Sequence, residues 1–175
     1  MFRVIVRTSL SSVRSNCFVP VAIFLTINKE DILMSNKVNK KIIEEMFTKA
    51  PQTTLGIKKI IELDTINGLA KAIYSAKLNM CHSGNIVQGG FITGWLDAVM
   101  ALACMCKVGS DVLVLSLEIK TTFIKSINPG PVIVEGKVIK AGNNIAFLEG
   151  KIVDQKNNLL AKANQTVKLI KNFYK

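Results

Sequence analysis

The chain has 175 residues, a hydrophobic fraction of 49% and four prolines, which exclude a disordered chain and fit one domain with a single core. Its 23 basic and 12 acidic side chains give a net charge of +11, but the lysines are spread singly through nearly every segment. Nucleic-acid surfaces need clustered basic residues, so this pattern indicates a solvated lysine-rich surface and argues against a nucleic-acid partner.

The four cysteines, at positions 17, 81, 104 and 106, form no CxxC pair and no regular disulfide framework. We therefore expect reduced thiols, no metal site and a cytoplasmic protein. Cys104 and Cys106 fall at the end of an apolar segment, and we expect them in the core.

Residues 1–33 differ in composition from the rest of the chain. They hold all three arginines, and the mainly apolar run 18–27 is too short to span a bilayer as a helix. A transit peptide, which would imply organellar import, a signal peptide and an upstream extension are the three alternatives. We favour an extension with the true start at Met34, because the composition from there on matches the remainder. Residues 34–175 then form the single domain.

The first predicted elements are a short amphipathic helix over 39–48 and two strands over 55–63 and 69–78. The Asn-Gly pair in the turn 64–68 is a strong hairpin signal. A loop is expected over 79–88.

A helix is predicted over 91–106, where Thr93 and Asp97 carry the only strongly polar groups. An apolar cylinder of this kind must be wrapped by other elements. Gly109 is expected to end it.

The remainder predicts four strands, over 112–127, 132–141, 145–154 and 159–170. Short loops between them favour antiparallel neighbours. In the first strand, simple alternation separates two sets of side chains: Leu117, Ile119, Thr121 and Phe123 on one side, and Ser116, Glu118 and Lys120 on the other. The predicted class is α+β, a curved antiparallel sheet of five to six strands wrapped around one long central helix.

Asp97 lies too far into the predicted helix to cap its first turn. Burying its charge costs free energy unless partners compensate, and such carboxylates are typical of catalytic sites. A structural aspartate hydrogen-bonded to the neighbouring loop is the alternative.

The helix begins at Gln88-Gly89-Gly90, which offers no Ser, Thr, Asp or Asn as a cap, so we expect its first amides to lack a side-chain acceptor. Free amides at the positive end of a helix suit a developing oxyanion. Alternatively, the two glycines merely let the helix pass close to a strand.

Eight residues separate Gly89 from Asp97, a rise of about 12 Å along a helix. A catalytic group must lie within roughly 3 Å of the atom it attacks. If both features act on one carbonyl, they must come from two chains, which predicts an obligate dimer with paired sites at its interface.

Residues 85–104, NIVQGGFITGWLDAVMALAC, resemble the signature of PaaI-like hotdog thioesterases, in which HGG or QGG precedes an Asp by eight residues from its first glycine. The resemblance extends over about residues 50–170. It implies a hotdog fold and hydrolysis of an acyl-CoA, or less readily an acyl-carrier-protein thioester, to a free acid and a thiol. It also implies a homodimer or a tetramer built as a dimer of dimers, with no cofactor, metal or membrane span.

Carried over by position, the resemblance implies that the Gly89 amide polarises the thioester carbonyl and that Asp97 is the nucleophile or general base. Ser116 matches a Ser or Thr that positions the water or the carboxylate. Gln88 replaces the commoner His, so it would orient or donate rather than transfer a proton. His82 stands where many members have Asn, and its role is open.

Candidate substrate contacts are Gly90, Asn85, Phe91 and Trp95. For Phe91 and Trp95 plain core packing is an equal alternative to lining an acyl tunnel. The competing function is a non-catalytic acyl-CoA-binding or sensor module of the same fold, against which the presence of Asp97 argues.

Overall fold

The computed structural model describes residues 40–171. In chain order the elements are α2 (Lys40–Thr48), β1 (Ile57–Asp64), β2 (Leu69–Ala76), the 3₁₀ turns η1 (Leu78–Met80) and η2 (Ser83–Asn85), α3 (Gly89–Val108), β3 (Leu113–Phe123), β4 (Gly130–Ala141), β5 (Ile145–Val153) and β6 (Leu159–Ile170). The predicted extension over 1–33 and the start at Met34 lie outside the described residues and stay predictions.

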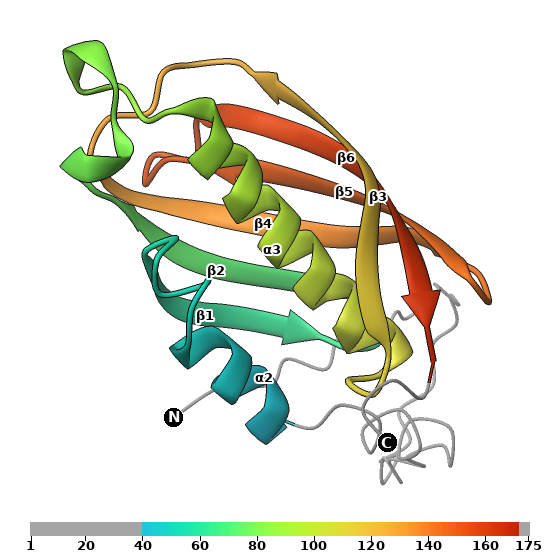
Figure 1. Cartoon of the computed structure of the whole chain (residues 1–175). Helices are drawn as coiled ribbons and strands as arrows, with labels where there is room; N and C mark the ends of the chain where they lie inside the picture. The colour runs from blue at the N-terminus through green and yellow to red at the C-terminus, as the bar shows by residue number, and fades with distance from the viewer. Residues whose placement is uncertain (1–39, 172–175) are drawn as a thin grey trace, which may run out of the picture.

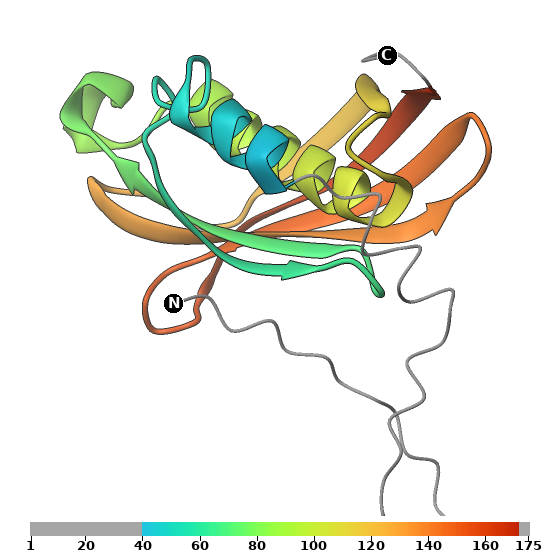
Figure 2. The same ribbon diagram turned by 90° about the horizontal axis from the view of Figure 1, so that it is seen from below.

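The six strands form one antiparallel sheet in the order β1-β2-β4-β5-β6-β3. Figures 1 and 2 show this sheet curling around α3, with α2 on the same side of the sheet as α3. The predicted α+β architecture of five to six strands around one long helix is therefore confirmed.

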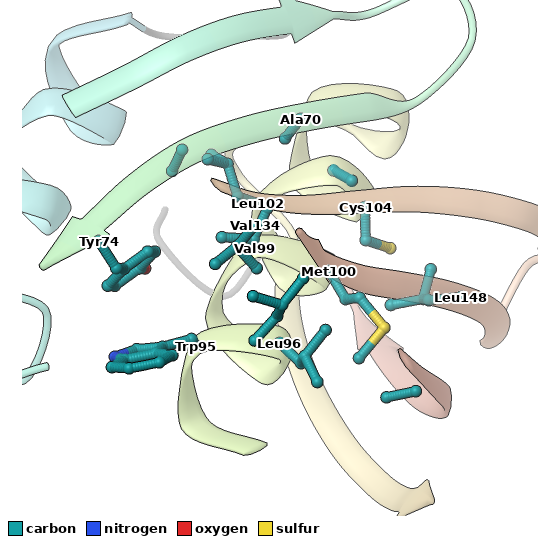
Figure 3. Packing of buried hydrophobic residues seen from close by; sticks show 14 of the residues in the cluster. Ala70, Tyr74, Trp95, Leu96, Val99, Met100, Leu102, Cys104, Val134 and Leu148 are labelled. Carbon is teal, nitrogen blue, oxygen red and sulfur yellow. The ribbon is translucent and has the colours of Figure 1, made fainter. Parts of the chain in front are cut away.

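Helix α3 forms the centre of the core. Its side chains Trp95, Leu96, Val99 and Met100 are fully buried, and Figure 3 shows them projecting toward the surrounding strands. Within residues 40–171, α3 alone is long and apolar enough to cross a membrane by length and composition, yet most of it is buried in the fold. Its apolar character is that of a core helix wrapped by a sheet.

Two facing glycines allow α3 to lie close to the sheet. Gly136 in β4 and Gly150 in β5 are register partners. A Cβ at Gly136 would lie 2.6 Å from the Val99 carbonyl oxygen and 2.7 Å from the Met100 amide nitrogen. A Cβ at Gly150 would instead meet the flexible end of the Met100 side chain at 3.0 Å. Only glycine at position 136 therefore leaves enough room for the helix backbone.

Two segments differ in detail from the prediction. The predicted strand 112–127 ends earlier, because the chain leaves the sheet after Phe123 and the Ile127 carbonyl accepts a hydrogen bond from the Val87 amide. This contact anchors the segment that enters α3. The predicted loop 79–88 contains most of two 3₁₀ turns, η1 and η2.

The predicted alternation along β3 agrees with the register from Glu118 to Phe123 but is wrong for Ser116 and Leu117, and the reason is a β-bulge. Ser116 is in register with Val167 of β6, but Glu118 is in register with Thr166, so Leu117 is an extra residue. The side-chain pattern therefore inverts at this point. Ser116 and Ile119 both share the α3-facing side of the sheet, whereas Leu117 is 58% exposed.

We expect Gly136→Ala to lower the free energy of unfolding by about 1–3 kcal/mol, because the new methyl group meets helix backbone. Gly150→Ala is the matched control and should destabilise less, because the Met100 side chain can move aside. Urea denaturation of both variants measures this difference. Equal effects would contradict the close approach of α3 to β4.

Candidate active site

The Asp97 carboxylate is held by side chains from two strands. The Ser116 hydroxyl of β3 donates to Asp97 Oδ1 at 2.6 Å. The Gln165 amide of β6 donates through Nε2 to the same oxygen, and also to Ser116 Oγ at 2.7 Å. Asp97 itself is half-buried. Its partners therefore lie in the sheet, not in the neighbouring loop.

Local sequence explains how these three groups meet. The bulge at Leu117 turns Ser116 toward α3. Gln165 occupies an inward position of β6, between the buried Ala163 and Val167. Asp97 lies on the part of α3 that passes these strands.

Gln165 was not predicted as a site residue, although the sequence holds a signal for it. The inward-facing residues of β6 are otherwise apolar: Ala161, Ala163, Val167 and Leu169. A glutamine at the central position of this alternating series is a polar group where the pattern predicts core. Such a polar interruption of an apolar series marks a candidate site residue.

The hydrogen bonds around Asp97 are unevenly distributed. Both donors bind Oδ1, so Oδ2 has no hydrogen-bond donor among the residues that the structure describes. Gln165 is only 3% exposed, and its Oε1 has no partner within the same residues. A buried acceptor without a partner costs about 1–3 kcal/mol, and such groups call for a functional explanation.

The start of α3 differs from the prediction in one respect. The Gln88 side chain is the cap, since its Oε1 accepts a hydrogen bond from the Gly90 amide at 2.9 Å. The prediction that no side chain accepts from the first amides was therefore wrong for Gly90. A glutamine does this because its longer side chain can fold back. Within residues 40–171 the Gly89 amide donates no hydrogen bond, which leaves it available to a ligand.

The remaining predicted site residues are dispersed. His82 and Asn85 are exposed in the segment before α3, and Phe91 is partly buried against the core. Trp95 is fully buried, and its Nε1 donates to the Leu55 carbonyl at 2.7 Å. As placed, Trp95 contributes to the core. The substrate contacts predicted for these residues stay predictions.

Two other features of the described part of the chain bear on function, its potential for metal binding and a surface hollow. No group of three or more His, Cys, Asp or Glu side chains there could hold a metal ion. A surface hollow of about 480 Å³ is lined by lysines such as Lys120 and Lys162 and by the acidic Glu135 and Glu149. These side chains lie on the face of the sheet that points away from α3, so the hollow is separate from Asp97.

A six-stranded antiparallel sheet curled around one long central helix is the architecture of the hotdog fold. Two solved structures share this fold. The Escherichia coli PaaI protein, from the phenylacetic acid degradation operon, superposes with a TM-score of 0.68 at 19% identity, over 75% of this chain and 93% of that one. The Haemophilus influenzae thioesterase HI1161 gives 0.67 at 18% identity, over 75% and 90%.

Sequence comparison identifies the family. The thioesterase superfamily model matches residues 84–161, which include Gly89, Asp97 and Ser116 but not Gln165. A Saccharolobus solfataricus protein that is provisionally named an esterase is 31% identical over 126 residues, covering 70% of this chain and 86% of that protein. The chain belongs to the thioesterase superfamily, and this membership supports thioester hydrolysis as its general activity.

The buried cysteines are expected to be chemically inert. Burial raises the pKa of Cys104 and of Cys106 to about 12, whereas Cys81 is partly exposed. Thiolates are the reactive form, so iodoacetamide at pH 8 should label Cys81 in the native protein and spare the other two. Peptide mass mapping before and after unfolding measures this. Rapid native labelling of Cys104 would contradict its burial.

Proposed function

We propose that this protein hydrolyses acyl-CoA thioesters to a free acid and CoA, with Asp97 as nucleophile or general base and the Gly89 amide as oxyanion donor. One observation carries the proposal: Asp97 is tethered through Oδ1, while Oδ2 has no donor among residues 40–171. A carboxylate fixed on one side and open on the other is suited to attack or to proton abstraction.

Two routes use this oxygen. As nucleophile, Oδ2 attacks the thioester carbon, the C–S bond breaks, the CoA thiolate leaves and takes up a proton, and water then cleaves the acyl-aspartate anhydride. As general base, Oδ2 accepts a proton from a water molecule that attacks the same carbon, and the thiolate leaves with a proton. Both routes give one acid and one thiol.

The negative charge that develops on the thioester oxygen needs a donor. The Gly89 amide lies at the positive end of the α3 dipole and has no acceptor within the described residues. A preorganised amide of this kind stabilises a developing oxyanion more than the ground-state carbonyl. The adjacent Gly90 amide is engaged by Gln88.

Gly89 and Asp97 of one chain are about 12 Å apart along the helix, which supports a site built from two chains. Strand β3 supports the same conclusion, because it lies at the edge of the sheet and its Ser116 contacts Asp97. Its outward side chains Leu115 and Leu117 are 40% and 58% exposed. An apolar edge strand favours pairing with another copy of itself. We propose a homodimer formed through β3.

Asp97→Asn should reduce kcat on acyl-CoA substrates by at least about 100-fold, because the attacking oxygen is lost. Gly89→Pro should reduce it by about 100- to 1000-fold, because proline is tolerated at the first helical position and removes the amide hydrogen. Its Cβ would lie 3.0 Å from the Phe123 ring, a contact that alanine at this position shares. Thiol release from acetyl-, octanoyl-, palmitoyl- and phenylacetyl-CoA measures both.

The controls are Asp111→Asn, at an exposed carboxylate after α3, and Gly89→Ala, which keeps the amide. The first should leave kcat unchanged, and the second should lose less activity than Gly89→Pro. Binding of acyl-CoA by the wild type without turnover would favour the sensor module instead.

Mixing the two inactive variants tests the shared site. Unfolded Asp97→Asn and Gly89→Pro chains, refolded together in equal amounts, should form heterodimers in which one of the two sites is intact. With random pairing about half of the dimers are heterodimers, and each heterodimer has one intact site out of two. About a quarter of wild-type activity should therefore be recovered. Each variant refolded alone is the control. No recovery despite confirmed heterodimers would contradict the two-chain site.

A further inference from the structure

We infer that Gln165 is a positioning residue of this site, holding Asp97 through Oδ1 and directing Oδ2 at the thioester. The inference rests on the proposed function. It concerns a residue outside the segment matched by the thioesterase superfamily model, which ends at residue 161.

The contacts form a closed triangle of side chains. Gln165 Nε2 donates to Asp97 Oδ1 and to Ser116 Oγ, and Ser116 Oγ donates to Asp97 Oδ1. Two donors on one carboxylate oxygen restrict rotation of the carboxylate. The position of Oδ2 is then fixed by groups on two different strands.

Gln165 also orients the serine hydroxyl. Because an amide hydrogen of Gln165 occupies a lone pair of Ser116 Oγ, the hydroxyl hydrogen is directed to Asp97. Without Gln165, the hydroxyl could rotate and Asp97 would be held by a single donor that is itself less constrained. Ser116 and Gln165 therefore act as one unit.

Stability alone does not account for this glutamine. Its position in β6 is 3% exposed and lies between Ala163 and Val167, where an apolar side chain would pack without polar groups to satisfy. Its Oε1 has no partner among the residues the structure describes. Gln165 is therefore unfavourable for the core, yet it donates two hydrogen bonds to side chains of the candidate active site. Its effect on Asp97 is the best explanation for its presence.

The test replaces Gln165 with methionine, which has similar length and no donor, in the full chain. We expect kcat to fall by about 10- to 100-fold, the loss typical of a misplaced catalytic group, while KM stays within about twofold. The melting temperature should be equal to or above that of the wild type. Leu169→Val is the matched control: it trims the same face of β6 without contacting Asp97, and should lower the melting temperature while leaving kcat of the folded protein unchanged.

A double-variant cycle separates positioning from general damage. In the Asp97→Asn background, adding Gln165→Met should leave the residual rate unchanged, because the group that Gln165 holds is already gone. Gln165→Glu, which keeps the shape and replaces the donor by an acceptor, should lose at least as much kcat as Gln165→Met, and it serves as the test if the methionine variant does not fold.

Wild-type kcat in both Gln165 variants would overturn the inference while leaving the proposed function intact. A further fall in the Asp97→Asn background equal to that in the wild type would also overturn it. Absence of turnover by the wild type on every acyl-CoA would instead reject the proposed function itself, and this inference with it.

Discussion

The placement of one carboxylate in an apolar, sheet-wrapped helix is the constraint on which this structure depends. Helix α3 must be surrounded because its side chains are apolar on every face, and Gly136 lets it lie against the β4 backbone. This close packing places Asp97 next to β3 and β6. The charge is then satisfied by Ser116 and Gln165 rather than by solvent alone. The same packing that builds the core therefore sets the geometry of the candidate active site.

The two groups of the proposed chemistry are separated by about two turns of α3. The Gly89 amide lies at its first residue, and Asp97 lies about two turns further along. Because β3 is an apolar edge strand beside Asp97, a second copy of the chain is the natural source of the missing amide. In this account dimerisation completes the site and also covers the exposed side chains of β3.

Much of the fold could be predicted because its helices and strands have strong periodic patterns in the sequence. The uniformly apolar helix, the Asn-Gly turn before β2 and the alternating strands each gave the correct element. The bulge at Leu117 was not predictable, since it leaves an unbroken strand-like pattern and inverts the facing of side chains without a local marker. Gln88 was missed as a cap because it lies outside the usual capping types, although its side chain reaches Gly90. Gln165 was detectable as a polar residue in the apolar face of β6, but its contact with Asp97, 68 residues away in sequence, was not predictable.

The most direct test of the central claim is a crystal structure with a non-hydrolysable thioether analogue of an acyl-CoA bound. The account predicts that the acyl carbon will lie within about 4 Å of Asp97 Oδ2 of one chain, with the Gly89 amide of a second chain facing the oxyanion position. Both groups coming from the same chain, or an analogue bound in the hollow near Lys120 and Lys162, would contradict it.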